Sequence, residues 1–443
     1  MAHPIDRRDF LKTSTAYGGA LWVVGSGSGL RAGTANETPN IACIGVGGQG
    51  GSHVDNVPKG GGKIVALVDV DETKLDEASK KQPGAKRYKD FRKMLDEMAK
   101  DIDGVCVATP DHTHAVAANA AMLLGKGCYC EKPLTHSIHE ARTLTETARR
   151  MKVGTQMGNQ GQSGDGTRRI VEIVRSGAIG PIKEVHGWTD RPIWPQGIDR
   201  PDRSDPVPAS LDWDLWIGPS PMRPYVKDTY HPFAWRGWWD FGTGALGDMA
   251  CHILSAAYWA LDLKYPTSIE VLEGGPRKPE NGPKSEVLKY NFPSRGQMPP
   301  VSVTWHDGGK TPSAELFEGE EIKKGGCILV GEKGKLYVNN DYGAEQNLLP
   351  KSAFAGYKNP PETLKRSPGH HRDWIEAVKD PSRPACSDFR YSGPLTEMVL
   401  LGVVAFRLGK TVEWDGPNMR ATNAPEAEAL IRPPYRAGWS LGS

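Results

Sequence analysis

Short apolar runs alternate with amphipathic segments along the first part of the chain. Four runs predict strands: IACIGV at 41–46, KIVALVDV at 63–70, DGVCVATP at 103–110 and GCYCEKP at 127–133. Between two of these runs, apolar residues from Phe91 to Met98 recur at a helical period, and Asp90 stands at the expected N-cap. The alternation is typical of βαβ units and predicts a parallel sheet.

The pattern changes after about residue 160. Five segments with strand character follow without helices of the crossover type: PIKEVHGWTD, TSIEVLEG, SEVLKYNF, VSVTWHDG and CILVGEKGKLYVNN. They predict an antiparallel sheet with one covered face. Helical periodicity returns in HRDWIEAVKD and LTEMVLLGVVAFRLG, which we expect to close against the core.

The N-terminal segment has the features of a targeting signal. Arg7 and Arg8, followed by Phe10, Leu11 and Lys12, match the twin-arginine pattern. The stretch 16–30 is too short and too rich in Gly and Ser for a transmembrane helix. We therefore expect residues 1–35 to be a signal peptide, the mature protein to be periplasmic or otherwise exported, and no stable membrane anchor. The alternative is a disordered tail with a chance Arg-Arg pair.

Charge and cysteine content exclude several partners. Removal of residues 1–35 lowers Lys+Arg from 55 to 51 and Asp+Glu from 53 to 51, so the mature chain is formally neutral. Neither nucleic acid nor an anionic membrane is an expected partner. Seven cysteines are few and odd in number for a disulfide framework. Cys128 and Cys130 lie on one strand face without a second pair of ligands, so no metal site is expected.

A glycine-rich motif follows the first predicted strand. Gly45, Gly47 and Gly50 fit Gly-x-Gly-x-x-Gly, and Asp69 ends the second strand 19 residues after Gly50. Such glycines let a pyrophosphate approach the backbone at a helix N-terminus, while the acid accepts from ribose hydroxyls. Because Asp69 would repel a 2′-phosphate, NAD is favoured over NADP, although nearby Lys74 could adapt. The alternative is a glycine-rich turn beside a solvated aspartate.

Two further motifs follow in register. ATPDHTHA ends a strand at Thr109 and then places His112 and His114 in the first turn of a helix, where they could simply cap and pack. EKP places Lys132 at the carboxyl end of the next strand. Ligands bind over this edge of an open α/β sheet, so we expect Lys132 to face the nicotinamide end of a bound cofactor.

Together the motifs GVGGQG, LVDVD, ATPDHTHA, EKP and GDMACH resemble those of the glucose-fructose oxidoreductase, inositol dehydrogenase and rhizopine-catabolism (Gfo/Idh/MocA) family. The resemblance implies an α/β fold with an N-terminal Rossmann domain and a C-terminal α/β domain built on a large, mostly antiparallel open sheet. It also implies a Lys132–Pro133 peptide that can be cis, and a homo-oligomer formed through the C-terminal sheet. The expected parts are a signal peptide at 1–35, an NAD-binding domain at 36–160 and a substrate-binding and oligomerisation domain at 161–443.

The segment 244–262 predicts a helix on which Asp248 and His252 are four residues apart and share a face. They coincide with the aspartate and histidine of the family that the chain resembles. A neutral His252 can accept the hydroxyl proton, Asp248 can orient the ring or bind a hydroxyl, and Lys132 can polarise the oxygen or share the proton. The principal base stays open, and Gly247 and Cys251 depart from the commoner family pattern.

Seven of the 13 tryptophans lie between Trp188 and Trp239 in a stretch with little periodicity. Their faces could stack on sugars, with Arg236, His231 and Asp240 binding hydroxyls, and the stretch could form a lid. Alternatively the tryptophans pack the loop or an interface.

The candidate residues form three sets. Those expected to bind the cofactor are Gly45, Gly47, Gly48, Gln49, Gly50, Asp69, Thr109, His114, Glu131, Lys132 and Asn159. Those expected to bind substrate are Lys132, Arg236, Asp248 and His252, and the catalytic set is Lys132, Asp248 and His252.

This pattern favours an NAD-dependent oxidoreductase that acts on a hydroxyl of a sugar, glycoside or polyol and holds its cofactor tightly. A second hypothesis is redox-neutral glycoside cleavage through oxidation, elimination, addition and reduction. A third is a non-enzymatic sugar- or cofactor-binding protein, which the retained Lys132, Asp248 and His252 disfavour.

Overall fold

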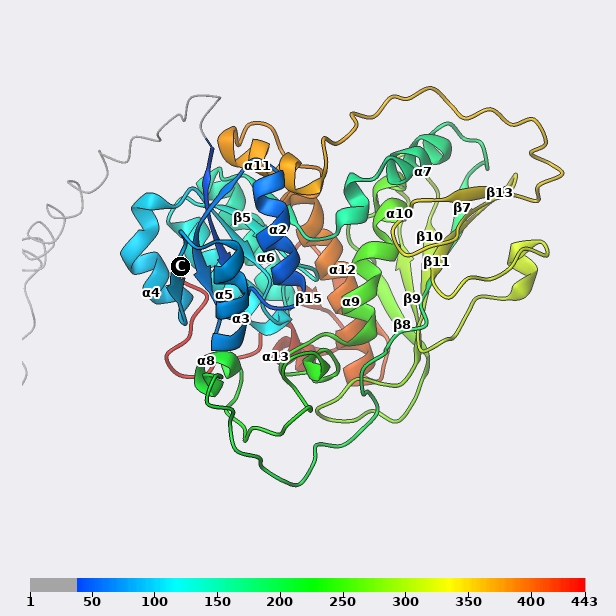
Figure 1. Ribbon diagram of the computed structural model, residues 1–443. Helices are drawn as coiled ribbons and strands as arrows, with labels where there is room; N and C mark the ends of the chain where they lie inside the picture. Colours follow the sequence, from blue (N-terminus) through cyan, green and yellow to red (C-terminus); the bar gives the residue numbers. More distant parts are fainter. Residues whose placement is uncertain (1–37, 443) are drawn as a thin grey trace, which may run out of the picture. The chain divides into compact units, whose positions relative to one another are not determined.

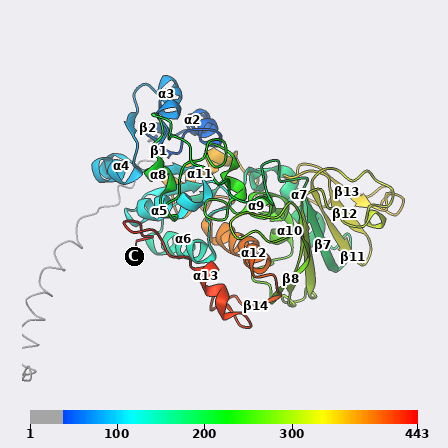
Figure 2. The same cartoon turned by 90° about the horizontal axis from the view of Figure 1, so that it is seen from below.

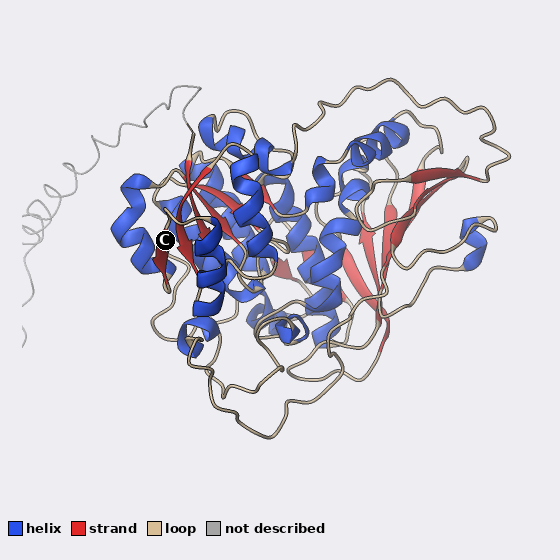
Figure 3. Cartoon of the chain, viewed as in Figure 1, coloured by secondary structure: helices blue, strands red, loops and turns tan. Residues whose placement is uncertain are grey.

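The computed structural model describes residues 38–442, and Figure 1 traces them from blue to red. The twin-arginine motif and the predicted signal peptide lie outside the described residues. Within them, strands form two separate sheets, one of six strands and one of nine. Figure 3 shows the two groups of strands with helices packed around and between them.

The first sheet is fully parallel, with the strand order β3-β2-β1-β4-β5-β6. Its strands are β1 (Asn40–Ile44), β2 (Lys63–Val68), β3 (Lys86–Tyr88), β4 (Gly104–Val107), β5 (Gly127–Cys130) and β6 (Thr155–Met157). The central strands are buried on both faces, as their continuous apolar runs require. This order is that of a Rossmann sheet, and the predicted N-terminal fold is confirmed.

Helices connect the parallel strands. They are α2 (Gln49–Lys59), α3 (Glu72–Lys81), α4 (Phe91–Met98), α5 (Asp111–Leu123) and α6 (Ile138–Met151). The predicted amphipathic helix is α4: Phe91, Met94, Leu95 and Met98 are its buried residues. Asp90 caps it by accepting a hydrogen bond from the backbone N–H of Arg92, which satisfies one of the free donors at a helix start.

The second sheet has the order β13-β12-β11-β7-β10-β9-β8-β14-β15. Its strands are β7 (Ile182–Trp188), β8 (Ser268–Gly274), β9 (Glu286–Phe292), β10 (Val301–His306), β11 (Gly326–Gly331), β12 (Lys335–Val338), β13 (Gln346–Leu349), β14 (Val412–Asp415) and β15 (Arg420–Ala421). All neighbours pair antiparallel except β7 and β10. The predicted large, mostly antiparallel sheet is therefore confirmed.

Helices cover one face of this second sheet, as Figure 2 shows. They are α7 (Asp165–Arg175), α9 (Gly244–Ile253), α10 (Ser255–Ala260) and α12 (Phe389–Leu408). The segment expected to be one helix over 244–262 is divided into α9 and α10 at Leu254. Helix α12, which carries most of its residues buried, contacts α6 of the first part as well as α9 and β8 of the second.

Two segments from late in the chain pack against the part that contains the first sheet. Helix α11 (His370–Lys379) packs on β5, β6 and α2 of the first sheet. Beyond α13 (Glu428–Ile431), the red segment in Figure 1 runs back to α4 and α8 (Trp213–Ile217). The amide of Asn119 on α5 donates to the carbonyl oxygen of Leu441 at 2.6 Å, which fixes this return.

Candidate functional site

A cavity of about 690 Å³ lies at the carboxyl ends of β1, β2, β4 and β5. Strand order reverses between β1 and β4, and such a switch point is where open α/β sheets bind ligands. The cavity extends from the glycine-rich loop at Gly45 to Lys132, Asp248 and His252. One cavity therefore contains both the nucleotide motif and the predicted catalytic residues.

The glycine-rich loop leaves no room for side chains at two positions. Gly45 has a φ of +79°, and a Cβ there would lie 2.6 Å from the carbonyl oxygen of Ala108. A Cβ at Gly50, in the first turn of α2, would collide with the carbonyl oxygen of Gly45. The backbone therefore turns tightly from β1 into α2 and is open to a close ligand, which fits a dinucleotide pyrophosphate at the start of α2.

Asp69 lies at the end of β2 and lines the cavity. Its carboxylate accepts hydrogen bonds from the backbone N–H groups of Val46 at 2.8 Å and Gly47 at 3.2 Å, and from Asp71 at 3.0 Å. It thus holds the glycine-rich loop in shape, while a carboxylate has further lone pairs for a ribose hydroxyl. The ammonium of Lys74, the only nearby cation considered from the sequence, is paired with Glu77 at 3.2 Å.

Lys132 follows β5, and its ammonium donates to the carboxylate of Asp248 at 2.8 Å and to the Asp248 carbonyl oxygen at 3.1 Å. The Lys132–Pro133 peptide is cis. Burial alone would lower the pKa of Lys132, but Asp248 and Glu131 outweigh it and raise the pKa above the usual value. Asp248 shows the converse: burial would raise its pKa, but Lys132 and Arg236 lower it. Lys132 and Asp248 are therefore an ion pair at neutral pH.

His252 lies one turn after Asp248 on α9 and is 8% exposed. Burial and the positive charge of Lys132 lower its pKa to about 3, so the imidazole is neutral at pH 7. Its Nδ1 is buried and has no hydrogen-bond partner among residues 38–442. The ring also meets the edge of Tyr342, with ring centroids 5.0 Å apart.

Glu131 connects the Lys132 segment to a histidine pair that the sequence did not reveal. His53 Nε2 lies 2.9 Å from the Glu131 carboxylate, and His53 Nδ1 lies 2.9 Å from Nε2 of His371. Burial would raise the pKa of Glu131, but His53 and Lys132 lower it to about 2. Glu131 is thus a buried anion that is held by His53 and stabilises the charge of Lys132.

His114 connects two backbone segments of the same region. Its Nδ1 lies 2.9 Å from the carbonyl oxygen of Pro133, and its Nε2 lies 2.8 Å from that of Thr109. The imidazole therefore ties the end of β4 to the segment that carries Lys132. Both His114 and Thr109 line the cavity, but the nitrogens of His114 already face backbone carbonyls.

Most of the predicted residues line this cavity, and two do not. The lining residues from the predicted sets are Gly45, Gly47, Gly48, Gln49, Asp69, Thr109, His114, Glu131, Lys132, Arg236, Asp248 and His252. Gly50 lies behind the loop. Asn159 is buried. Its side-chain amide donates hydrogen bonds to the Cys251 carbonyl oxygen and the Ser255 hydroxyl, and its Oδ1 accepts one from the Ser387 hydroxyl.

The tryptophan-rich stretch packs part of its tryptophans in a core and places others in the cavity wall, and their stacking on a sugar stays a prediction. Trp213, Trp216, Trp235 and Trp238 pack in one hydrophobic cluster, and two of them, Trp216 and Trp235, also line the cavity together with Trp194. The Arg236 guanidinium lies 4.3 Å from the Trp235 ring centroid and 3.4 Å from the Asp248 carboxylate. Asp240 lies elsewhere, in a second cavity.

The nucleotide end of the cavity has walls that the motifs did not indicate. Phe91 from α4, Leu215 from α8 and Trp439 from the C-terminal segment line it together. The Trp439 ring packs near Phe91, and the Arg92 guanidinium lies 4.2 Å from the Trp439 ring centroid. Arg436 anchors this segment by bonds to Asp214 and to the Gly218 carbonyl oxygen.

Residues 38–442, the part of the chain that the structure covers, contain no group of three or more His, Cys, Asp or Glu side chains arranged to hold a metal ion. None of its helices has the length and apolar character needed to cross a bilayer.

Family comparisons cover nearly all of the described chain. Residues 39–159 match a Gfo/Idh/MocA model described as "Oxidoreductase family, NAD-binding Rossmann fold". Residues 166–441 match a second model, described as "Oxidoreductase family, C-terminal alpha/beta domain". The chemistry of the glycine-rich loop and of Asp69 agrees with the first match.

Among curated proteins, the chain is 28% identical over 167 residues to inositol 2-dehydrogenase of Rhodococcus erythropolis, covering 37% of this chain and 48% of that protein. It is 32% identical over 212 residues to a glycosyl hydrolase family 109 protein of Shewanella amazonensis, covering 41% and 45%. The chain thus spans about half the length of the curated relatives it matches.

Solved structures share the fold over most of the chain. A levoglucosan dehydrogenase in complex with NADH and levoglucosan has a TM-score of 0.58 at 18% identity, covering 85% of this chain and 99% of that one. The aldose-aldose oxidoreductase of Caulobacter crescentus has a TM-score of 0.54 at 17% identity, covering 85% and 100%.

Proposed function

This chain belongs to the Gfo/Idh/MocA family of oxidoreductases, and from that premise we propose that it is an NAD-dependent oxidoreductase acting on a hydroxyl of a sugar, glycoside or polyol. The observation that carries the proposal is the contact between Lys132 and Asp248, with His252 one turn away in the cavity that also contains the glycine-rich loop. Relatives named as inositol and levoglucosan dehydrogenases support this substrate class.

NAD, when bound, supplies the two-electron acceptor for such a reaction. The residues that would hold it are Gly45, Gly47, Gly48 and Gln49 at the pyrophosphate and Asp69 at the ribose. Asp69 and the engagement of Lys74 by Glu77 favour NAD over NADP, since a 2′-phosphate would meet a carboxylate without a free cation beside it.

Lys132 acts through its charge. Its ammonium is held at a fixed position by Asp248 and by the buried anion of Glu131. A hydroxyl that loses its proton develops negative charge on oxygen, and a preorganised, largely buried cation stabilises that charge strongly. Lys132 thus lowers the barrier to deprotonation and does not itself need to be neutral.

His252 is the proposed proton acceptor. It is neutral at pH 7, it lines the cavity, and it lies one turn from the carboxylate that Lys132 contacts. The anion of Asp248 stabilises the imidazolium that forms, as an aspartate does beside a catalytic histidine. Arg236 and Asp248 offer a fork of N–H donors and a carboxylate to neighbouring hydroxyls, which fits a polyol.

A substrate panel tests this proposal. The purified protein would be incubated with inositols, levoglucosan, free hexoses and aryl glycosides, and NADH absorbance would be recorded beside product analysis. Oxidation of at least one polyol or sugar, abolished in Lys132→Met, is the expected result. Absence of oxidation of every compound in the panel by the NAD-loaded protein, or oxidation that is undiminished in Lys132→Met, would contradict it.

A second function is supported by the relatives named as glycosyl hydrolase family 109 proteins. In redox-neutral cleavage, a ring hydroxyl is oxidised, a neighbouring proton is removed, the aglycone leaves, water adds and the ketone is reduced again. His252 would serve as the base at carbon, and Lys132 would stabilise the enolate. Release of an aglycone without net NADH formation in the same panel would select this function.

We also propose export by the twin-arginine route, on the pattern that begins at Arg7 and Arg8. Fusion of residues 1–35 to a reporter, compared with the same fusion carrying two lysines in place of the arginines, tests it. Transport of the first fusion alone is the expected outcome.

A further inference from the structure

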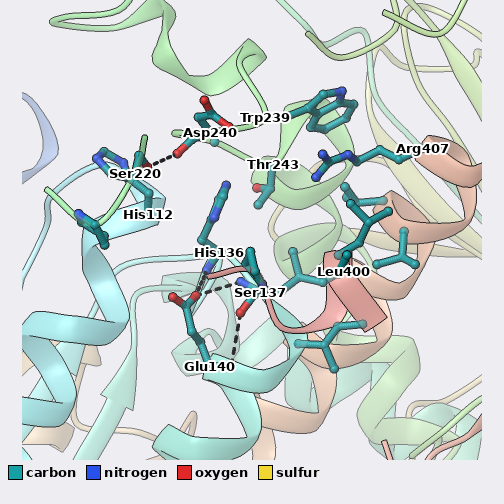
Figure 4. A pocket seen from close by; sticks show the side chains of 18 of the residues that line it. His112, His136, Ser137, Glu140, Ser220, Trp239, Asp240, Thr243, Leu400 and Arg407 are labelled. Carbon is teal, nitrogen blue, oxygen red and sulfur yellow. Dashed lines mark hydrogen bonds between the residues drawn. The ribbon is translucent and has the colours of Figure 1, made fainter. Parts of the chain in front are cut away.

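A second cavity, of about 230 Å³, lies apart from the first, between α12 and the loop that precedes α9 (Figure 4). Arg407 of α12 and Trp239 and Thr243 of the loop form one side, and His136 and Glu140 lie on another. None of the residues assigned to the main site lines this cavity.

Arg407 lacks a hydrogen-bonding or ionic partner among the described residues of this cavity. Its side chain is half-buried, and within residues 38–442 it makes neither a hydrogen bond nor an ion pair. The guanidinium carbon lies over the ring of Trp239, 5.5 Å from the ring centroid. Burial lowers the pKa of Arg407 from its usual value, and the negative charge of Asp240 offsets only part of that effect.

The acidic groups of the cavity are already engaged. Asp240 pairs with the guanidinium of Arg223. Glu140 accepts from the hydroxyl of Tyr435 at 2.6 Å and from two backbone N–H groups, those of Ser137 and His136. The pKa of His136 is lowered to about 4 by burial and by Arg407, so its ring adds no charge at neutral pH. Arg407 is thus the charged group of the cavity that lacks a direct partner.

Much of the remaining lining is apolar, with the hydroxyls of Ser137, Ser220 and Thr243 among it. Leu400, Val403 and Val404 of α12, together with Leu430 and the Trp239 ring, supply apolar lining. Pro221 and Pro434 belong to the lining and are exposed, so the cavity reaches solvent beside them. A ligand that fits must therefore combine one negative group with a small apolar body.

The position of Arg407 offers one other explanation. It lies in the last turn of α12, where a cation is favourable near the helix C-terminus. That interaction needs no ligand. However, the Arg407 side chain donates to none of the terminal carbonyl oxygens, and in Figure 4 it points toward Thr243 and the cavity.

We infer that this second cavity binds a small monocarboxylate with an apolar body, held by Arg407 at the carboxylate and by the α12 and Trp239 walls around the body. Planar Arg–carboxylate pairing is bidentate and strong when shielded from water. The inference does not depend on the proposed reaction at the main site.

Calorimetric titration of the purified full chain with benzoate, and separately with its neutral isostere benzamide, tests the inference. We expect saturable binding of benzoate and at least about tenfold weaker binding of benzamide, the scale of one charge-assisted hydrogen bond. Arg407→Met should weaken benzoate binding by at least about tenfold. Arg390→Met, which removes an exposed arginine paired with Asp388 on the same helix, should leave it unchanged.

Because Lys132 is a second buried cation, the benzoate titration is repeated in Lys132→Met, where binding should persist. Absence of saturable benzoate binding, equal affinity for benzamide, unchanged binding in Arg407→Met, or loss of binding in Lys132→Met would each overturn the inference. Inorganic phosphate that binds more tightly than benzoate would also overturn it, in favour of a simple oxyanion site. If Arg407→Met does not fold, the comparison of benzoate with benzamide still decides.

Discussion

Lys132 and His252 line the same cavity but differ in charge at neutral pH. The raised pKa of Lys132 keeps its ammonium positive, and the pKa of His252, lowered to about 3, keeps the imidazole neutral. The sequence alone left the principal base open between them. We propose His252 as the acceptor and Lys132 as the stabilising charge, because an ammonium that donates to Asp248 has no lone pair to accept a proton.

Lys132→Met and His252→Ala should each lower kcat by about 10² or more while NAD still binds, because each removes a group that acts on the reacting oxygen and leaves the glycine-rich loop intact. Turnover and calorimetric NAD affinity measure the two effects separately. Lys100→Met, at an exposed lysine, is the matched control. Normal turnover in either variant would show that the substituted residue contributes to packing and not to catalysis.

Asp111 should make stability depend on pH. Burial raises its pKa in the folded state from the usual 3.8 to about 7. Between these values the unfolded state loses the proton that the folded state keeps, so this group lowers stability as pH rises from about 4 to about 7. In the wild type the Thr243 hydroxyl donates to the Asp111 carboxylate at 2.8 Å. Asp111→Asn keeps an oxygen that can accept this hydrogen bond but has no group that titrates.

Urea unfolding at pH 5 and pH 8 measures the effect. The free energy of unfolding of Asp111→Asn relative to wild type should increase by about 1–3 kcal/mol between the two pH values. The exposed Asp96→Asn serves as the control and should show a much smaller pH-dependent difference. A difference for Asp111→Asn that does not change with pH would contradict the raised pKa.

At the scale of elements, the sequence predicted those helices and strands whose apolar residues recur with a regular spacing. The strands and α4 follow alternation or helical spacing, and the loop after β1 follows its glycines. The shared carboxyl edge of the parallel strands predicted the place of Lys132, whereas Asp248 and His252, which lie on α9, were assigned to the same site through the family resemblance.

Other contacts had no local pattern from which they could be inferred. His53 and His371 meet across 318 positions of sequence, and neither belongs to a recognised motif. The segment around Trp439 has no period, and it is placed by tertiary bonds from Arg436 and Asn119. Such contacts depend on how the helices and loops pack, which single-residue preferences do not specify.

Trp439→Ala should speed NAD dissociation by about tenfold, because an aromatic wall contributes on the order of 0.5–1.5 kcal/mol beyond the area it buries. Release can be followed by stopped-flow displacement with excess labelled NAD. Trp439→Phe should restore most of the retention, and Trp259→Ala, at a tryptophan outside the cavity, should not change it. Equal release rates in all four proteins would remove Trp439 from the nucleotide site.

At the scale of the whole molecule, the cavity is lined by segments from distant parts of the chain. The glycine-rich loop, the tryptophan-rich stretch with Leu215 and Trp235, and the C-terminal segment with Trp439 all contribute to it. A cofactor that contacts all three gives up contacts with each of them when it leaves, which slows its release. We therefore expect the cofactor to stay bound through the reaction cycle.

Protein purified without added nucleotide should therefore carry NAD or NADH at near-stoichiometric amounts, detectable by mass spectrometry and absorbance after denaturation. An exported protein needs this retention, since the compartment beyond the membrane is not expected to supply free NAD. Each cycle must then restore the cofactor in place, through a second sugar, an external acceptor or a redox-neutral reaction. Protein that arrives empty and requires millimolar NAD would contradict this expectation.

The distance in sequence between the Rossmann strands and Trp439 also orders events during synthesis. Strand β6 ends at Met157, and Trp439 follows it by 282 residues, the difference of the two numbers. At about 5–20 residues per second, a ribosome needs roughly 15 to 55 seconds to cross that interval. Because domains generally fold as they emerge, we expect the six-stranded sheet to form before Trp439 is synthesised, so that NAD can reach the glycine-rich loop during those tens of seconds.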